Sequence, residues 1–271
     1  MDQQPFLYFL SEFLGTFVLM LIGLGVNANV SLKKTKGFNS GWIVITWGWA
    51  MGVLIGATIA LYSGGQLNPA VAVGLWATKQ ITISFFFLAI AGQLFGAFVA
   101  SLLIVYLFWD HFKATDNADA VAGTFFTSPA IKSPLRNFMT EIFGTFVLVG
   151  GILFATIYSK STNGLLPALL YGPLFAGLIV FAVGLTLGGL TGYAINPCRD
   201  LCPRLAHWLM PVPNKGSSHW SYVWVPVIGP IVGALFAVAI AYIALVIGNG
   251  EIGDVPNWGA NVASLNLFLY I

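Results

Sequence analysis

The chain has 271 residues, of which 58 % are apolar, 15 % aromatic and only 7 % charged. Soluble domains carry about 25 % charged residues, so this chain lacks the polar side chains that a water-facing surface needs. The composition excludes an ordinary cytosolic enzyme, a disordered chain and a nucleic-acid-binding protein, and the net charge of +2 points to no partner. The sequence therefore predicts a protein of the lipid bilayer.

A helix needs about 20 mostly apolar residues to cross a bilayer. Six such stretches occur, at about 6–27, 41–63, 83–109, 137–158, 166–187 and 222–248. The first is not a signal peptide, because it lacks a basic start, contains Glu12 and is too long. We therefore predict an all-α, multi-pass protein of the cell membrane, with both termini on one side and residues 1–271 in a single transmembrane domain.

Two further apolar segments, about 68–78 and 196–207, are too short to cross. Each begins with Asn-Pro, as Asn68-Pro69-Ala70 and Asn196-Pro197-Cys198. Asn is a good N-cap and Pro is tolerated in the first helical turn, so each segment predicts a half-helix. Half-helices at membrane depth survive only where protein buries them or where they line a wet cavity.

The two halves of the chain repeat one another. The segment 11–20 matches 140–149 at six of ten positions, and the two Asn-Pro pairs are 128 residues apart. Each half, 6–109 and 137–248, contains an odd number of predicted spans, so the second half must enter the membrane from the opposite side. Such an inverted repeat is typical of proteins that form a pathway with its key site at the midplane.

In an inverted repeat, the two half-helices enter from opposite faces and meet N-terminus to N-terminus. Each N-terminus carries about half a positive charge, which opposes cations and protons at the midplane. The side-chain amides of Asn68 and Asn196 can donate hydrogen bonds to a permeating hydroxyl or water oxygen. That oxygen would then direct its own hydrogens away and interrupt a chain of protons.

At these residues the sequence resembles the aquaporin, or major intrinsic protein, family, and within it the glycerol facilitators. The resemblance extends from Glu12 to Gly233 and rests on the NPA-type motifs SGGQLNPAV (63–71) and GYAINPCRD (192–200). The family usually has Ala-His in place of Gly65-Gln66, and Ala in place of Cys198. Neither change removes an Asn or a Pro.

Three places favour the glycerol branch of the family. Asp200 directly follows Arg199, Pro226-Val227 resembles a Pro-aliphatic pair in the last span, and residues 122–127 resemble a glycerol-type loop. The resemblance implies a passive channel for glycerol and other small neutral solutes, such as urea or dihydroxyacetone, which also conducts water and excludes ions and protons. It also implies a homotetramer with one pore per subunit, and no cofactor, metal or nucleic acid.

By resemblance, Arg199 forms the narrowest ring of the channel with Tyr193, Gly184 and one residue of the second span. Arg199 supplies a fixed fork of donors for hydroxyl groups, whereas Tyr193 offers an aromatic face for the C–H edge of a polyol. The residue twenty positions before Asn68 is Gly48. We expect Gly48 to be the fourth wall, with Trp47 as the alternative if the second span is irregular.

The remaining polar residues are expected to support this ring and the two motifs. Glu12 and Glu141 are the acidic residues inside full spans, and we expect them to accept hydrogen bonds from the loops before the half-helices rather than to relay protons. We expect Asp200 to orient the nearby loop. Cys198 and Cys202 complete no metal pattern and are expected to pack as apolar residues.

Three alternatives stay open. A water-selective aquaporin would share the fold, and a secondary transporter would also contain inverted repeats, with Glu12 or Glu141 as the coupling site. A membrane-embedded enzyme would need a catalytic or metal cluster that the sequence does not contain. Orientation is also open, because the family has both termini in the cytoplasm, whereas the loop with Lys33, Lys34 and Lys36 favours the reverse.

Overall fold

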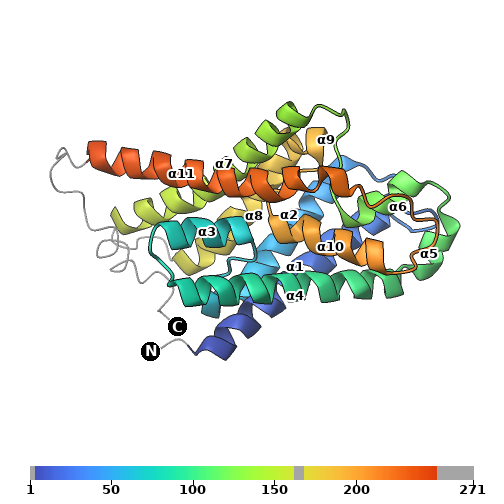
Figure 1. The fold of residues 1–271 in the computed structure, drawn as a ribbon. Coiled ribbons are helices and arrows are strands. Elements are labelled where there is room, and N and C mark those ends of the chain that lie inside the picture. The colour runs from blue at the N-terminus through green and yellow to red at the C-terminus, as the bar shows by residue number, and fades with distance from the viewer. Residues whose placement is uncertain (1–3, 162–167, 249–271) are drawn as a thin grey trace.

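The computed structural model describes residues 4–161 and 168–248, and the surroundings of side chains for 4–155 and 172–244. Within these residues every regular element is a helix. The long helices are α1 (Pro5–Ser31), α2 (Trp42–Ile59), α4 (Ile83–Leu107), α7 (Pro134–Ser161), α8 (Ala168–Thr186) and α11 (Trp224–Gly248). Two shorter helices, α3 (Pro69–Ala77) and α10 (Pro197–Leu209), lie among them (Figure 1). The predicted six spans and two half-helices are confirmed.

The long helices have the length and hydropathy of membrane spans. Among the described residues, α1, α2, α4, α7 and α11 each contain an apolar stretch long enough to cross a bilayer. The described part of α8, Gly172–Thr186, is equally apolar but shorter. The complete α8 has 19 residues, and at about 1.5 Å per residue it approaches the roughly 30 Å of the hydrocarbon core.

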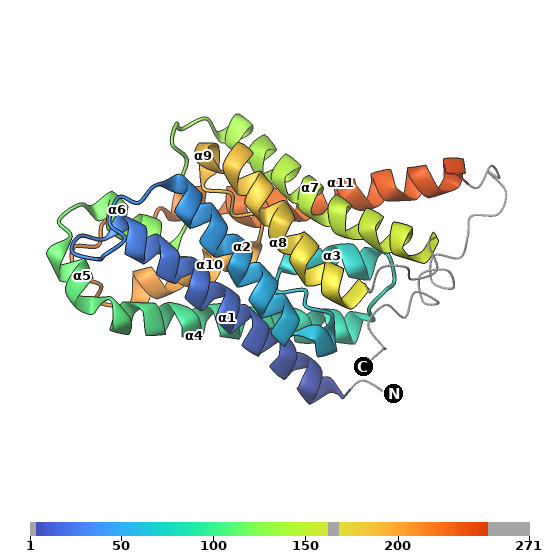
Figure 2. The same ribbon diagram turned by 180° about the vertical axis from the view of Figure 1, so that it is seen from behind.

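The same pairs of helices pack together in the two halves of the chain. Helix α1 packs along α4 and α7 packs along α11, while α2 and α8 join the two halves. Figure 2 shows α1, α2 and α8 side by side. Each half-helix also packs against the last long helix of the other half, α3 on α11 and α10 on α4. Because each half-helix packs on the other half, the two halves form one packed unit. The boundaries of the two repeats, 6–109 and 137–248, stay a prediction.

Glycine residues allow the helix backbones to approach closely where α4 crosses α1 and where α11 crosses α7. A Cβ atom on Gly96 of α4 would lie 2.4 Å from the carbonyl oxygen of Phe13 in α1. A Cβ atom on Gly233 of α11 would lie 2.3 Å from the carbonyl oxygen of Ile142 in α7. Helices in membranes associate through such small residues, because lipid provides little hydrophobic drive for helix pairing.

Several short elements were not predicted from the sequence. They are α5 (Trp109–Ala114), α6 (Ala118–Phe125), α9 (Gly188–Thr191) and the 3₁₀ turns η1 (Leu61–Ser63) and η2 (Trp220–Tyr222). Helices α5 and α6 lie together at one end of the bundle, at the right in Figure 1. We call this end the α6 side and the opposite end, where α1 begins and α11 ends, the α3 side.

Candidate functional site: a polar and apolar cavity between two half-helices

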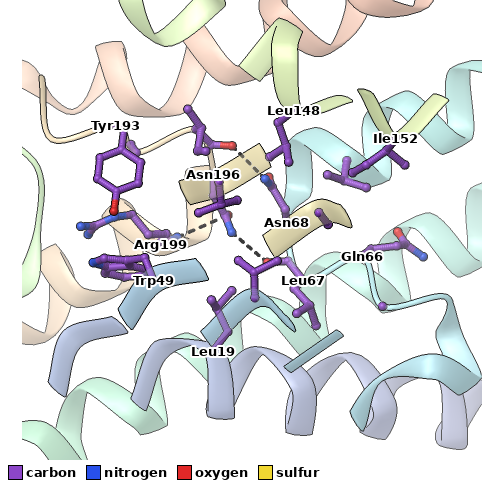
Figure 3. A pocket seen from close by; sticks show the side chains of 17 residues that line it. Leu19, Trp49, Gln66, Leu67, Asn68, Leu148, Ile152, Tyr193, Asn196 and Arg199 are labelled. Atoms are coloured by element: carbon purple, nitrogen blue, oxygen red, sulfur yellow. Dashed lines mark hydrogen bonds between the residues drawn. The ribbon is translucent and has the colours of Figure 1, made fainter. Parts of the chain in front are cut away.

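Both half-helices begin in the same way. The Asn68 Oδ1 atom accepts a hydrogen bond from the Ala70 N–H at 2.8 Å, and the Asn196 Oδ1 atom accepts one from the Cys198 N–H at 3.1 Å. A proline follows each asparagine in the first helical turn, where its missing N–H removes no helical hydrogen bond. The two helix starts face each other, with Asn68 and Asn196 close together (Figure 3).

The two asparagines also bind each other's loops. The Asn68 Nδ2 group donates to the carbonyl oxygen of Ile195 at 2.8 Å, and the Asn196 Nδ2 group donates to the carbonyl oxygen of Leu67 at 2.9 Å. A carboxamide NH₂ group has two hydrogens. One N–H of each asparagine therefore remains for a molecule in the cavity.

A cavity runs past this meeting point and has two chemically different walls. The polar wall consists of residues 65–68 and 193–196, with Arg199 at its α6 end. The opposite wall is made of aliphatic side chains from four long helices: Leu19, Val53, Leu148, Ile152 and Val180. A molecule in the cavity therefore has hydrogen-bonding groups on one side and hydrocarbon on the other.

The loops before the half-helices adopt an unusual backbone conformation. Leu67, Tyr193 and Ile195 have φ angles of 54°, 37° and 42°, in the left-handed region that side-chain-bearing residues rarely occupy. Such strain persists only where the surroundings hold the backbone in place. Here the strained backbone presents the Leu67 and Ile195 carbonyl groups to the facing asparagine.

Glu12 of α1 holds the loop before α3. One carboxylate oxygen accepts from the Ser63 hydroxyl at 2.5 Å and the Gln66 N–H at 3.0 Å. The other accepts from the Leu67 N–H at 2.9 Å and the Gln93 side-chain amide at 2.7 Å. Glu12 is completely buried, so these four donors replace the water that a carboxylate would otherwise bind.

Glu141 of α7 does the same for the loop before α10. Its oxygens accept from the Thr191 hydroxyl at 2.7 Å, the Ala194 N–H at 3.1 Å and the Ile195 N–H at 2.8 Å. Glu141 is 1 % exposed. These are the loop contacts that the sequence analysis expected of both glutamates, and they leave each carboxylate occupied by its own loop.

Gln66, which departs from the family motif, lies on the α3 side of the cavity (Figure 3). Its Nε2 group donates to the Tyr8 hydroxyl and, at 3.1 Å, to the carbonyl oxygen of Ser63. Its Oε1 atom is buried and has no protein hydrogen-bond partner among the described residues. Gln66 therefore adds a fixed, non-titrating amide to this part of the cavity.

At the α6 end of the cavity, Trp49, Tyr193 and Arg199 face one another, and we call these three residues the arginine ring (Figure 3). The guanidinium carbon of Arg199 lies 4.2 Å from the centre of the Trp49 ring, within the range of a cation–π contact. Arg199 Nη1 donates to the carbonyl oxygen of Phe125 at 3.1 Å. Arg199 is 6 % exposed, so its position is fixed by protein rather than by water.

Gly184 lies behind Tyr193 rather than along the cavity. A Cβ atom on Gly184 would lie 2.9 Å from the Tyr193 ring, so glycine makes room for that ring. The carbonyl oxygen of Gly184 accepts from the Trp42 indole N–H at 2.9 Å, and the Trp42 and Tyr193 rings meet edge to face. The expected wall residue Gly184 thus acts through the placement of its neighbour.

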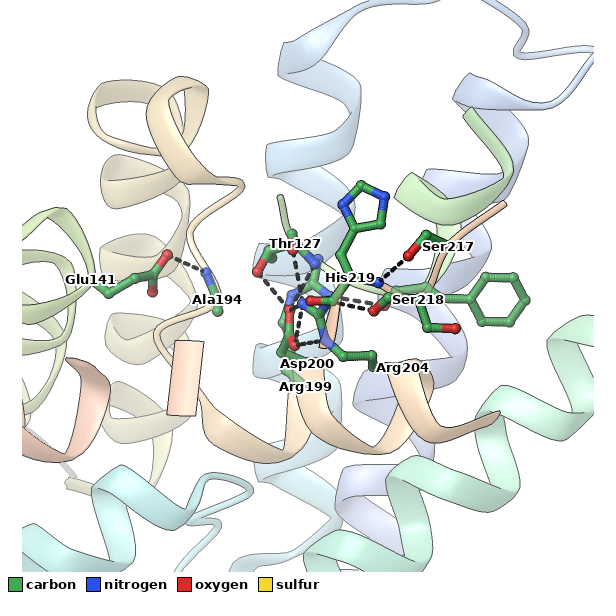
Figure 4. A network of polar contacts seen from close by, with 10 residues as sticks. Thr127, Glu141, Ala194, Arg199, Asp200, Arg204, Ser217, Ser218 and His219 are labelled. Atoms are coloured by element: carbon green, nitrogen blue, oxygen red, sulfur yellow. Dashed lines mark hydrogen bonds and ion pairs between the residues drawn. The ribbon is translucent and has the colours of Figure 1, made fainter. Parts of the chain in front are cut away.

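A buried polar cluster supports the arginine ring from the α6 side (Figure 4). The Asp200 carboxylate accepts from Thr127, through its N–H at 2.8 Å and its hydroxyl at 2.6 Å. The same carboxylate pairs with Arg204, whose Nε and Nη2 groups lie 2.7 and 2.9 Å from its two oxygens. Arg204 Nη2 also donates to the carbonyl oxygen of Thr127 at 3.0 Å. Asp200 therefore fixes the loop that follows α6, as the sequence analysis expected.

The prediction that Gly48, or alternatively Trp47, is the fourth wall of the ring is wrong. A Cβ atom on Gly48 would lie 2.6 Å from the Val26 side chain, so Gly48 faces α1. Trp47 is 48 % exposed on the outside of the bundle, with its ring against Phe181. Trp49 lines the cavity instead. The count from Asn68 failed because it crosses η1 and three residues with positive φ, where helical register is lost.

Cys198 is fully buried, and its thiol lies 3.1 Å from Asn196 Oδ1 and 3.7 Å from the carbonyl oxygen of Leu67. It is absent from the described lining of the cavity. Cys202 is 5 % exposed and also carries a free thiol. Both thiols are therefore packed inside the protein, and Cys198 helps to fill the contact between the two loops.

Comparison with known proteins agrees with this architecture. Residues 4–242 match the family model described as major intrinsic protein. The chain belongs to the major intrinsic protein family. Members of this family are multi-pass membrane channels, not enzymes.

Named relatives of this major intrinsic protein cover most of its length. A probable glycerol uptake facilitator protein of Thermotoga maritima is 46 % identical over 233 residues, which are 86 % of this chain and 97 % of that protein. The glycerol uptake facilitator protein of Bacillus subtilis is 44 % identical over 84 % of this chain and 81 % of its own. The solved aquaglyceroporin of Plasmodium falciparum superposes with a TM-score of 0.79 at 28 % identity, covering 92 % of this chain and 100 % of its own.

Several residues of the site were missed from the sequence. The partner of Asp200 had a local signal, since Arg204 lies four residues later and a third charged residue in a half-helix needs an explanation. The carbonyl groups of Phe125 and Thr127 had none, because every residue has a carbonyl group. Only the folded chain brings α6 against α10 and selects these two.

Proposed function

We propose that this major intrinsic protein is a passive channel that conducts glycerol and other small neutral solutes, together with water. The observation that carries the proposal is the cavity with one polar and one aliphatic wall, which the arginine ring lines at its α6 end. A polyol has hydroxyl groups along one edge and C–H groups along the other. This cavity is complementary to that pattern, because both edges find a partner at the same time.

The polar wall supplies both kinds of hydrogen-bonding group. The remaining N–H groups of Asn68 and Asn196 and the guanidinium of Arg199 donate. The carbonyl oxygens of Leu67 and Ile195 each keep a second lone pair beside the one that the facing asparagine uses, and this lone pair accepts. A hydroxyl group both donates and accepts, so it exchanges one partner for the next as the solute moves. We expect a sugar alcohol wider than glycerol to pass more slowly between Trp49, Tyr193 and Arg199.

We further propose that ions and protons do not pass. The N-termini of α3 and α10 direct about half a positive charge each toward the midplane, and Arg199 adds a full charge at the α6 end. These charges oppose cations, and oriented hydrogen bonds from the asparagines interrupt a proton-conducting chain of waters.

Transport coupled to an ion or proton gradient needs a group that can bind and release the ion or proton. No carboxylate inside the described spans is free to do so. Glu12 and Glu141 are the carboxylates there, and each is occupied by the N–H and hydroxyl donors of its own loop. Releasing either one would leave backbone N–H groups unpaired. This favours passive conduction over a secondary transporter.

Polyol conduction is favoured over water selectivity by the arginine ring. Trp49 and Tyr193 line this end of the cavity together with the donors of Arg199, whose guanidinium carbon lies 4.2 Å from the centre of the Trp49 ring. The relatives named above as glycerol uptake facilitators are 44 and 46 % identical to this chain. Urea and dihydroxyacetone are small and neutral enough to be further substrates.

We also propose that the protein forms a homotetramer with one pore per subunit. Large apolar side chains are exposed along the flanks of the long helices, for example Phe95 and Phe87 on α4. Subunits and lipid can both cover such flanks. The mass of the particle in a mild detergent tests this, and a mass equal to one protomer would contradict it.

The function is tested with purified protein in liposomes. Vesicles are mixed with an inward gradient of glycerol, urea or sorbitol, and light scattering follows the volume change in stopped flow. We expect fast passive entry of glycerol, slower entry of sorbitol and no effect of a protonophore. Glycerol entry no faster than in protein-free vesicles would exclude the proposed channel, and entry abolished by the protonophore would favour coupled transport.

A further inference from the structure

A buried amide, Asn27, connects the arginine ring to α6. Asn27 lies in α1, 5 % exposed, and is not part of the described cavity lining. A carboxamide has two donors and an acceptor to satisfy, which makes it costly inside an apolar bundle unless it is paired. Both polar atoms of the Asn27 side chain, Oδ1 and Nδ2, have a hydrogen-bond partner, and both partners belong to the surroundings of the ring.

The first partner is Trp49. The Trp49 indole N–H donates to Asn27 Oδ1 at 3.0 Å, and both side chains are buried. This bond fixes the edge of the indole, so that its face is directed at the guanidinium of Arg199. The six-membered part of the indole packs against Gly23 of α1, where a Cβ atom would lie 2.4 Å from the ring. Asn27 holds the opposite, N–H edge, so the orientation of the ring depends on both contacts.

The second partner is the end of α6. Asn27 Nδ2 donates to the carbonyl oxygen of Gly123 at 3.2 Å. Two residues later, the carbonyl oxygen of Phe125 accepts from Arg199 at 3.1 Å. The last carbonyl groups of a helix have no helical partner, so both are available to side chains. One turn of α6 therefore anchors both Trp49, through Asn27, and Arg199.

We propose that Asn27 is a positioning residue for solute selection, which sets the width of the arginine ring by holding the Trp49 indole against the last turn of α6. The proposal rests on the proposed polyol channel and names the residue that tunes it. Without Asn27, the indole N–H is a buried donor that lacks a partner. The lumen beside Trp49 offers water, so the ring turns its N–H into the lumen and narrows the passage for a polyol more than for water.

The test compares glycerol with water conduction in the same vesicles. Asn27→Leu keeps the size of the side chain and removes both hydrogen bonds. We expect the ratio of glycerol to water permeability to fall about fivefold, with the amount of protein in the vesicles unchanged. As a control, Asn137→Leu removes another buried amide, whose Nδ2 donates to the Ile131 carbonyl oxygen at 3.1 Å and not to a residue of the ring. That ratio is expected to stay within about twofold of the parent.

A double-mutant cycle separates positioning from a general structural role. Trp49→Phe removes the indole N–H, so Asn27 has nothing left to hold there. The positioning role predicts that Asn27→Leu lowers the ratio in the parent but has no further effect in the Trp49→Phe background. An equal fall in both backgrounds, or an unchanged ratio in the parent, would overturn it.

If Asn27→Leu fails to accumulate, Asn27→Ala, which adds no bulk, replaces it in the cycle. The parent protein serves as the reference for the function itself. Absence of glycerol conduction by the parent would exclude the proposed channel, whereas glycerol conduction by the parent with a ratio that is insensitive to Asn27 would exclude only the positioning role.

Discussion

The two half-helices start alike and continue differently. Both loops are held by a buried glutamate, and both helices begin with an asparagine cap followed by proline. Helix α3 then continues for 9 residues without a charged side chain. Helix α10 continues for 13 and carries Arg199, Asp200 and Arg204. The shared parts bring the two helices together at the midplane, and the parts that differ place selection at one end of the cavity.

Equivalent positions make this difference concrete. Three residues after each asparagine, α3 has Val71 and α10 has Arg199, and both line the cavity. Four residues after each asparagine, α3 has Ala72 and α10 has Asp200, and both are completely buried. One half of the repeat therefore accepts apolar side chains where the other builds a charged network.

The largest effect is expected where the halves are alike. Glu12→Leu and Glu141→Leu each leave at least two loop N–H groups buried without an acceptor, at about 1–3 kcal/mol each. This is a large part of the roughly 5–15 kcal/mol that stabilises a typical protein. We expect both variants to lose most of their folded protein, measured by size-exclusion chromatography in mild detergent. Normal recovery of either one would show that its loop is held by other contacts.

The next effect belongs to α10 alone. Asp200→Ala leaves Arg204 as a buried cation without its partner, which costs about 3–5 kcal/mol. We expect a clear fall in the unfolding midpoint in a denaturant titration in detergent. The double variant Asp200→Ala with Arg204→Met removes both charges and is expected to recover part of the loss. A double variant less stable than the single one would contradict this account of the pair.

Arg199→Val gives α10 the residue that α3 has at Val71. The substitution removes a positive charge and opens the space between Trp49 and Tyr193. We expect entry of polyols larger than glycerol to increase about tenfold, which corresponds to about 1.4 kcal/mol. Val71→Ala is the matched change in α3, and glycerol and larger polyols are expected to enter at rates within about twofold of the parent. Similar effects of the two changes, by stopped-flow light scattering, would remove the distinction between the half-helices.

The aromatic wall gives a smaller effect and tests the corrected register of α2. Trp49→Ala widens the arginine ring, so larger polyols are expected to enter several-fold faster. Trp47→Ala changes an exposed side chain on the outside of the bundle and is expected to leave solute ranking unchanged. Gly48→Trp is expected to reduce folded protein, because its side chain would meet Val26 of α1. A Gly48→Trp variant that folds and only narrows the channel would restore the original expectation.

The smallest effect concerns an exposed pair that contrasts with Asp200 and Arg204. Lys33 Nζ lies 2.5 Å from Asp116 Oδ1, and the Lys33 and Asp116 side chains are 45 % and 80 % exposed. The hydrogen bond from Lys33 holds the pKa of Asp116 below its usual value. A lowered pKa contributes stability above the unfolded-state pKa, and the contribution is lost as pH falls through the folded-state pKa. Asp116→Asn is therefore expected to lower thermal stability slightly at pH 7 and not at pH 2, and a larger loss in acid would contradict the sign.

Much of the fold could be predicted because its causes are local. Apolar runs of bilayer length and the Asn-Pro starts placed the long helices and both half-helices within a few residues. The positions of Glu12 and Glu141 in matching segments indicated that each serves the loop of its own half. Helices α5, α6 and α9 were not predicted, because they have 4 to 8 residues and depend on packing against the rest of the chain.

The arginine ring was only partly predictable. Arg199 and Tyr193 follow from their motif, since both lie within three residues of Asn196. Trp49 lies on another helix, and the chain between it and Asn68 contains a 3₁₀ turn and left-handed residues. Counting residues across such a segment does not give a direction in space. Asn27 and the carbonyl groups of α6 come from still other parts of the chain and are brought together only by folding.

The reciprocal bonds of the two asparagines also set the order in which the molecule can be completed during synthesis. They join Asn68 to Ile195 and Asn196 to Leu67, residues 127 and 129 apart. A ribosome that adds about 5–20 residues per second leaves α3 without these partners for roughly 6–25 s. Helix α3 also packs on α11, which emerges later still. The nascent first half therefore lacks these contacts while it is in the membrane. The contacts at the midplane form only after α10 and α11 have been made.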